Sequence, residues 1–354
     1  MVVIGREEAT GATARLGHYR ARDGSRGAAV DLDVDRPHVG LVVGKRGSGK
    51  TYTLGVLAEG LLAAEGVSPV VVDPMGAFTS LSAADVSVTV VDPSVRADAL
   101  DPRQWCAVLG LDPERGAGAL VWRAASERST LEGMRSWVAD SDAAASTGRA
   151  AANHLALAAS WDIFDAAGIE TGALCSDGLT VLDVSGLDSR PAGAVLAAVA
   201  TALYDGRMAG QTDRLPWLLV DEAHAFTDGV ARRPLHRLVT RGRQPGVSCV
   251  LATQRPSAVP ATTVSQTDLL VAHRLTSAAD IDALRAARPT YLDGDLAARL
   301  PEMTGDALVV DDGTESVHHV TVRERRTPHG GETPRASDLE ADRNHEVSAG
   351  GPET

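Results

Sequence analysis

Eight residues early in the chain have the types and the spacing that bind a phosphate group. The stretch "GKRGSGKT", Gly44 to Thr51, matches G-x-x-x-x-G-K-[ST] and lies between an apolar run and an amphipathic pattern. Gly44, Gly47 and Gly49 let the backbone curl, so that several N–H groups face one phosphate. Lys50 would reach the β- and γ-phosphates of ATP, and the Thr51 hydroxyl would bind Mg²⁺. The nucleotide-binding segment also contains Lys45, Arg46 and Ser48.

The alternative for this stretch is a flexible glycine-rich turn without a function, in which the lysine is incidental. Two observations disfavour it. The stretch stands between a predicted buried strand, "HVGLVVG", and a predicted helix, "KTYTLGVLAEGLLAAEG". Lysine also occurs at Lys45 and Lys50, both within this stretch, and nowhere else in the chain. All the other long cationic side chains are arginine. The sequence therefore predicts nucleotide binding.

Two adjacent acids follow a second buried run, "WLLV", at Asp221 and Glu222. Ligands of open α/β sheets bind at the carboxyl ends of the strands, so both acids are expected beside the phosphate loop. Asp221 would hold Mg²⁺ through its water shell. Glu222 would act as the general base that polarises the attacking water. The alternative, two solvated acids at a strand end, is improbable once a phosphate loop lies upstream.

Composition limits the class of protein. The 354 residues include 47 acids and 34 basic residues, for a formal charge of −13. The acid excess and the near loss of lysine favour a halophilic archaeon over the other interpretation, a GC-rich genome. The three cysteines, Cys106, Cys175 and Cys249, are far apart and predict neither a zinc site nor disulfides. No signal peptide or membrane span is expected, so we predict a cytoplasmic protein without membrane partners.

The order of elements predicts an α/β fold with a mostly parallel sheet covered by helices on both faces. Residues 1–35 are expected to form only a short N-terminal extension, and 36–326 the main domain. A helical insertion is expected at about 116–174, because Leu131, Met134, Trp137 and Val138 keep helical spacing. Residues 327–354 are acidic and poor in large apolar side chains, which predicts a disordered tail.

The letters Asp221-Glu222-Ala223-His224 also name a class of helicases. A helicase of that class needs a second RecA-like domain, for which this chain has no room, and its next strand ends "LATQRPSAVP" instead. We therefore interpret the four-letter match as incidental. The combination of motifs resembles the HerA-like branch of the HerA/FtsK superfamily of pumping ATPases. The segments that carry this resemblance are "RPHVGLVVGKRGSGKT", "VVVDPMG", "LLVDEAHAF" and "GRQPGVSCVLATQRPSAVP".

The resemblance implies a RecA-like P-loop core and a ring, possibly of six subunits, that moves duplex DNA by hydrolysing ATP with Mg²⁺. It also implies further catalytic residues. Gln254 would sense the γ-phosphate, and Arg243 would be the arginine finger that reaches a neighbouring subunit's nucleotide, with Arg241 as the second choice. The alternative for this arginine cluster is a solvated helix face.

Some features depart from the family pattern. HerA proteins carry an N-terminal β-barrel, which residues 1–35 are too short to form completely. Whether this chain binds the nuclease that is the family's usual partner is therefore left open. Ala77 stands where an acid often follows "DPxG", and Lys45-Arg46 makes the loop unusually basic. The competing function is an ATP-switched assembly or remodelling ATPase that acts on a protein partner instead of DNA.

Overall fold

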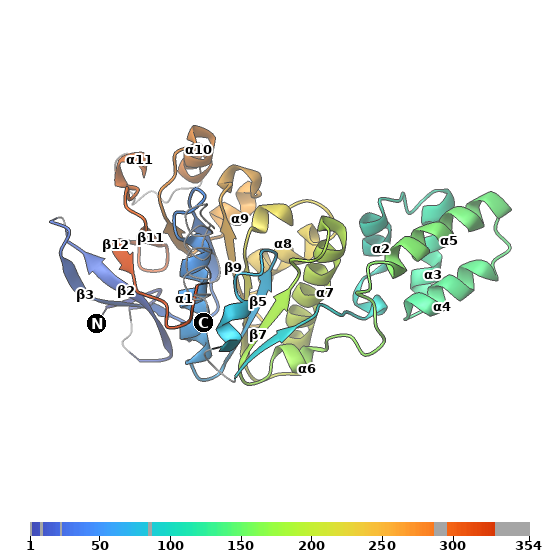
Figure 1. Cartoon of the computed structure of the whole chain (residues 1–354), viewed down its shortest axis with the longest axis horizontal. Coiled ribbons are helices and arrows are strands. Elements are labelled where there is room, and N and C mark those ends of the chain that lie inside the picture. Colours follow the sequence, from blue (N-terminus) through green and yellow to red (C-terminus); the bar gives the residue numbers. More distant parts are fainter. Residues whose placement is uncertain (1, 8–9, 22, 84–86, 287–295, 330–354) are drawn as a thin grey trace, which may run out of the picture.

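The structure is a computed structural model of the chain, and it describes all residues except 1, 8–9, 22, 84–86, 287–295 and 330–354. Within the described residues the strands form one twelve-stranded sheet in the order β1-β3-β2-β12-β11-β10-β4-β9-β8-β5-β7-β6 (Figure 1). The strands are β1 (Val2–Ile4), β2 (Thr13–Arg20), β3 (Arg26–Asp33), β4 (Val39–Val43), β5 (Val67–Asp73), β6 (Val88–Val91), β7 (Leu179–Asp183), β8 (Leu215–Val220), β9 (Ser248–Thr253), β10 (Leu269–Ala272), β11 (Asp306–Asp311) and β12 (Ser316–Val322).

The strands from β10 to β6 in this order are all parallel to their neighbours. β4, β5 and β9 are buried at every position, as expected for strands whose two faces are both covered. Because the strands are parallel, their carboxyl ends share one edge of the sheet. Val43 of β4 pairs with Thr253 of β9, and Val220 of β8 pairs with Leu251, which brings the ends of these three strands together.

Helices cover both faces of the sheet. They are α1 (Lys50–Leu62), α2 (Pro102–Leu109), α3 (Gly116–Glu127), α4 (Leu131–Ala139), α5 (Ala145–Ala159), α6 (Thr171–Leu174), α7 (Ser189–Met208), α8 (Arg232–Arg241), α9 (Ala261–Ser265), α10 (Ala278–Ala286) and α11 (Leu296–Arg299). Side chains alternate along each strand, so Val42 packs in the core beneath α1, whereas Leu41 and Val43 pack in the core beneath α7 and α8. The α/β fold predicted from the sequence is the fold observed.

The first 35 residues do not form a separate unit. β2 pairs antiparallel with β12 and β11 pairs antiparallel with β10, which joins β1–β3 to the parallel part of the same sheet. α1 crosses β2 at a close approach, because a Cβ on Gly60 would lie 2.6 Å from the Cβ of Ala14. The predicted boundary at residue 35 therefore falls inside one continuous sheet.

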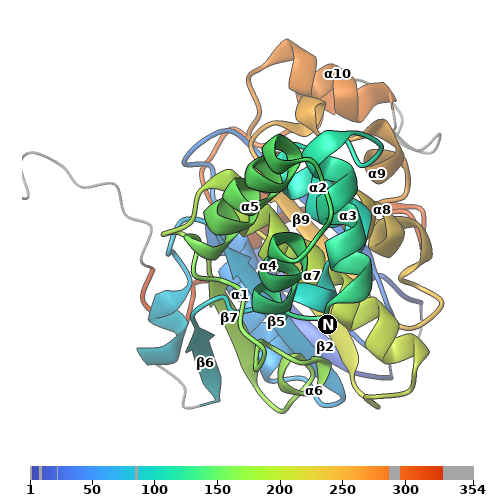
Figure 2. The same ribbon diagram turned by 90° about the vertical axis from the view of Figure 1, so that its right-hand side faces the viewer.

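Helices α2 to α5 stand beyond α7, at one end of the molecule (Figures 1 and 2). This helical insertion differs from the expected range in two ways. It begins at α2, before residue 116, because Trp105 is buried and donates its indole N–H to the carbonyl of Ala97. Residues 160–170 are not helical, because the chain returns to the core, where Phe164 bridges to Val95 and packs on Trp105.

The segment after β12 folds back onto α1. Glu59 of α1 is 7% exposed and accepts hydrogen bonds from the side chain of Arg323 at 2.6 Å and from the hydroxyl of Thr327 at 2.7 Å. Arg325 donates its backbone N–H to the hydroxyl of Tyr52 at 2.6 Å. The expected disordered tail, 327–354, lies outside the described residues from 330 onward. Among the described helices, none combines the length and the apolar character that crossing a membrane requires.

Candidate nucleotide site

The phosphate loop joins the end of β4 to the first residue of α1. Gly47 has a φ of 74° and Gly49 a φ of 115°, values in the left-handed region that glycine adopts without strain. A Cβ on Gly44 would collide with the hydroxyl of Ser48, so this position also requires glycine. The loop is fixed to the neighbouring strand as well, because the backbone N–H of Lys45 donates to the carbonyl of Arg274 at 2.8 Å. The sequence thus forms a curled backbone with its N–H groups beside a helix N-terminus.

Lys50 is almost completely buried at the start of α1. Its Nζ donates to the carbonyl of Lys45 at 3.1 Å. Burial lowers the pKa of Lys50, whereas the nearby carboxylates of Glu222 and Asp221 oppose that shift. The ammonium group is thus held over the loop close to two acids. Arg46, by contrast, is exposed.

Asp221 and Thr51 meet directly across the site. The Thr51 hydroxyl donates to Oδ2 of Asp221 at 2.6 Å. Asp221 is fully buried, and burial raises its pKa, while the hydrogen bond from Thr51 opposes that rise. Both oxygens suit a magnesium ion that takes its remaining ligands from phosphates and water. Within the described residues no group of three or more His, Cys, Asp and Glu side chains could hold a metal ion, and Thr51 and Asp221 would supply one oxygen each.

Glu222 has an unusual backbone conformation and an unsatisfied oxygen. Its φ of 46° is left-handed, and its N–H donates to Oδ1 of Asp221 at 2.9 Å. Its Oε2 is buried without a hydrogen bond from the described residues, as is the hydroxyl of Ser48 in the loop. Unsatisfied buried oxygens are unfavourable, and a bound nucleotide with magnesium and its water shell would supply partners for them. These residues therefore fit ATP and Mg²⁺.

Gln254 directly follows the end of β9. Because Thr253 pairs with Val43, Gln254 lies beside Gly44 at the start of the phosphate loop, where its side chain is partly exposed. The structure therefore brings Lys50, Thr51, Asp221, Glu222 and Gln254 to the same edge of the sheet.

Arg243 and Arg241 do not join this group. Arg241 is the last residue of α8 and is exposed. Arg243 donates to Oδ2 of Asp268 at 2.8 Å, and Asp268 precedes β10. Asp268 also accepts from the N–H of Val39, the first residue of β4, so Arg243 lies at the amino edge of the sheet. The five residues of β4 separate the two edges by about 16 Å. Arg243 is therefore too far from the phosphate loop of its own chain to contact a nucleotide there.

The structure adds two histidines that the motifs did not single out. His224 places its Nδ1 3.2 Å from Oε2 of Glu222 and 3.3 Å from the hydroxyl of Thr253. His273 lies beneath the phosphate loop, where its Nε2 is 2.9 Å from the hydroxyl of Thr53. Burial lowers the pKa of His273 to about 4. His224 is the last residue of the helicase-like motif Asp221-Glu222-Ala223-His224, so the sequence could have drawn attention to it. No local pattern distinguishes His273.

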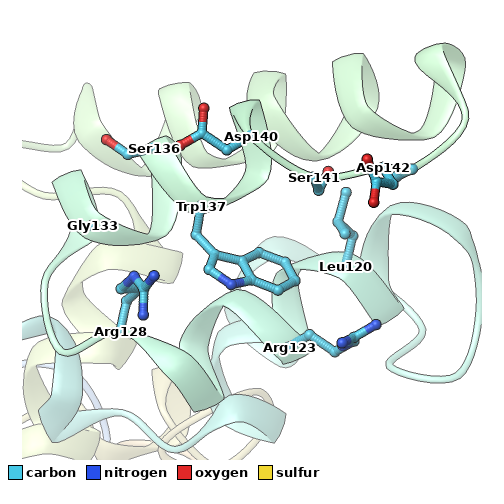
Figure 3. A pocket seen from close by; sticks show the side chains of 10 residues that line it. Leu120, Arg123, Arg128, Gly133, Ser136, Trp137, Asp140, Ser141 and Asp142 are labelled. Atoms are coloured by element: carbon cyan, nitrogen blue, oxygen red, sulfur yellow. The ribbon is translucent and has the colours of Figure 1, made fainter.

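A hollow of about 560 Å³ lies apart from this site, between α3 and α4 of the helical insertion (Figure 3). The guanidinium of Arg123 lies over the ring of Trp137, 5.6 Å from its centroid, and Arg128 lines the same hollow. Asp140 and Asp142 line the same hollow, so its charges have both signs. It contributes no residue to the phosphate site.

The chain is similar to one known protein family and to several solved structures. Residues 14–148 match the family model described as "Helicase HerA, central domain". No curated protein sequence matches the chain. Among solved structures, VirB4 of Thermoanaerobacter pseudethanolicus is 17% identical with a TM-score of 0.70, and the alignment covers 91% of this chain and 99% of that one. A bacterial conjugative coupling protein, TrwB, is 16% identical with a TM-score of 0.59, covering 92% of this chain and 91% of that one.

At such identities the solved structures establish the fold alone, which is that of RecA-like P-loop ATPases. The family match is independent of them and includes the whole phosphate loop. Nothing in these comparisons supports a halophilic origin. The predicted resemblance to the HerA-like branch is confirmed for residues 14–148, which match the model of that family's central domain.

Proposed function

We propose that this protein hydrolyses ATP and couples hydrolysis to the movement of duplex DNA within a ring of subunits. The observation that carries the ATPase proposal is the meeting of Lys50, Thr51, Asp221, Glu222 and Gln254 at one edge of the sheet. Lys50 and the loop N–H groups would bind the phosphates. Glu222 would accept the proton of the attacking water, because its carboxylate follows the end of β8 and lies close to Lys50 at the phosphate loop.

The position of Arg243 supports the ring. An arginine that stabilises phosphoryl-transfer charge must touch the nucleotide, and Arg243 stands at the opposite edge of the sheet from its own phosphate loop. As an arginine finger it would therefore serve a neighbouring copy. An interface between two different edges of the same molecule is head-to-tail, and such an interface generates a ring when the rotation between copies closes. The description of the matched family as a helicase domain supports DNA as the substrate.

The structure also offers a place for a phosphate backbone. A groove of about 660 Å³ between the helical insertion and the start of α8 is lined by Arg103, Arg232 and Arg233, together with Trp122, which is 39% exposed. None of these three arginines makes an ion pair with another residue that the structure describes. Glu114 is the acid in the same lining. In a chain of charge −13, this concentration of unpaired cations suits a polyanion.

The test measures ATP turnover with and without long duplex DNA over a range of KCl, together with molar mass by light scattering. We expect stimulation by DNA only where the protein is oligomeric. We also expect Arg232→Ala/Arg233→Ala to weaken DNA affinity and to flatten its log–log salt slope by about 0.9 for each phosphate that the variant no longer neutralises. The matched control is Arg135→Ala/Arg149→Ala, which removes the same charge elsewhere on the insertion.

A protein that hydrolyses ATP as a monomer and ignores duplex DNA at every salt concentration would refute the translocase. That result would instead favour the remodelling of a protein partner. If turnover is absent with and without DNA, and ATP does not bind, the ATPase proposal itself fails.

A further inference from the structure

The end of β8 and the end of β9 are connected by one imidazole. His224 lies in a short 3-10 turn, Ala223–Ala225, immediately after Glu222. Its Nδ1 is 3.2 Å from Oε2 of Glu222 on its own segment and 3.3 Å from the hydroxyl of Thr253 on β9. The next residue after Thr253 is Gln254, the residue expected to sense the γ-phosphate. A single nitrogen therefore stands between the expected general base and the strand that carries the expected sensor.

The two contacts of this nitrogen are not equivalent. Its contact with the Thr253 hydroxyl has hydrogen-bond geometry, whereas Oε2 of Glu222, at nearly the same distance, receives no aligned hydrogen bond from the described residues. A carboxylate oxygen so close favours the imidazole tautomer with its hydrogen on Nδ1. One N–H group cannot be aligned with both acceptors at once. A small rotation of the imidazole or of the carboxylate would exchange one partner for the other.

The surroundings keep this imidazole neutral. Burial lowers the pKa of His224, and the positive charges of Arg255 and Lys50 lower it further, while Asp221 opposes them. A neutral imidazole donates a hydrogen bond without placing a positive charge on Glu222. The carboxylate consequently keeps its capacity to accept a proton, which an ion pair would reduce.

The backbone after β9 also forms a hydrogen bond with the Thr253 hydroxyl. The backbone N–H of Arg255 donates to the hydroxyl of Thr253 at 3.0 Å, so the position of this oxygen follows the backbone on both sides of Gln254. A movement of Gln254 toward a phosphate would shift the partner with which His224 is aligned. The backbone of Glu222 is left-handed, with a φ of 46°, and its N–H donates to Oδ1 of Asp221, so we expect the carboxylate to adjust mainly through its side-chain torsions.

From this geometry we infer that His224 is a positioning residue for Glu222, and that its Nδ1–H exchanges between Thr253 and the Glu222 carboxylate as Gln254 engages the nucleotide. The inference depends on the proposed ATPase function and adds to it a link between sensing and catalysis. Aligned on Oε2, the N–H group would fix the carboxylate so that Oε1 faces the water. Aligned on Thr253, it would leave the carboxylate free to rotate.

The experiment compares steady-state ATP turnover in five proteins: wild type, His224→Ala, His224→Asn, Thr253→Val and Thr253→Ser. We expect His224→Ala to lower kcat about 10- to 100-fold, because a misplaced base loses rate on this scale. Its KM for ATP should change less than twofold, because His224 is not among the residues expected to bind the phosphates. His224→Asn should recover most of kcat, since its amide N–H can replace Nδ1–H. Thr253→Val should lower kcat less than His224→Ala, with Thr253→Ser as its matched control.

A second measurement separates positioning from mere folding. If His224 acts through Glu222, adding His224→Ala to Glu222→Gln should leave the residual rate unchanged, because the group that it positions is already disabled. Equal losses of kcat in both backgrounds, or a kcat of His224→Ala within twofold of wild type, would overturn the inference while the ATPase proposal stands. A Glu222→Gln protein with wild-type turnover would overturn the proposed general base as well.

Discussion

His38 should make the stability of this protein fall as the pH rises from neutral to alkaline. The imidazole is 5% exposed and lies between two carboxylates, with Nδ1 3.0 Å from Asp268 and Nε2 3.4 Å from Asp33. Burial by itself lowers the pKa of His38, but the hydrogen bonds and charges of these two acids outweigh it and raise the pKa from 6.5 to about 9. The folded protein thus holds a proton that the unfolded chain releases near pH 6.5.

The size of the effect follows from that difference. Raising the pKa from 6.5 to about 9 corresponds to about 3 kcal/mol of unfolding free energy, at about 1.4 kcal/mol for each pH unit. Because the folded pKa is raised, this contribution is fully present below pH 6.5 and is lost as the pH rises through 9. His38→Gln should therefore be much less stable than wild type at pH 6, and the difference should shrink by about 3 kcal/mol by pH 10.

The assay is urea unfolding of both proteins at pH 6, 7.5, 9 and 10, with His236→Gln, an exposed position on α8, as the control. A difference between wild type and His38→Gln that is constant from pH 6 to 10 would refute the reasoning. If His38→Gln does not fold, the wild type alone still provides the test. Its uptake of one proton on folding between pH 6.5 and 9 should be measurable by potentiometry, and no uptake would contradict the raised pKa.

Three further predictions concern the site. Lys50→Ala should lose ATP binding, measured by calorimetry, because the buried ammonium of Lys50 is held over the loop. Undiminished binding would contradict the assignment of the phosphate loop. Glu222→Gln should bind ATP but hydrolyse it about 10²- to 10⁴-fold more slowly in a phosphate-release assay, whereas the exposed control Glu132→Gln should retain full turnover. Arg243→Ala should bind ATP and lose about 10³- to 10⁵-fold in rate, and mixing it with Lys50→Ala subunits should restore activity; mixed rings without rescue would argue against an inter-subunit finger.

The elements that could be predicted from the sequence are those with a strong local pattern. The runs before Gly44 and before Asp221 are apolar at every position, which is typical of strands buried on both faces, and both are central strands of the sheet. The two motifs follow these strands directly. Parallel strands place both motifs at the same edge of the sheet, and the order β4-β9-β8 then brings Thr51 and Asp221 within hydrogen-bonding distance.

The features that could not be predicted depend on contacts between distant parts of the chain. β2 pairs with β12, whose residues lie just over 300 positions later in the chain, and neither strand carries a signal that identifies its partner. The start of the helical insertion at α2 depends on Trp105 packing on Phe164, which also interrupts the expected helix around residue 164. The pairing of Arg243 with Asp268 is likewise set by the fold. A sequence pattern could suggest what Arg243 does but not on which edge of the sheet it lies.

The two edges of the sheet are linked by the same strands. β4 begins after His38 and ends at the phosphate loop, and β9 begins at Ser248 and ends before Gln254. At the amino edge the two strands are joined, because the N–H of His38 donates a hydrogen bond to the hydroxyl of Ser248 at 3.0 Å. Asp268 joins His38 to Arg243 at the amino edge. Because close-packed interiors transmit strain, we expect a displacement at one end of these buried strands to reach the other. In a ring, nucleotide binding at the carboxyl edge of one subunit would thereby change the position of the arginine that it presents to the next. This coupling predicts cooperative hydrolysis, and cooperativity should disappear in Asp268→Asn, where Arg243 loses its charged partner.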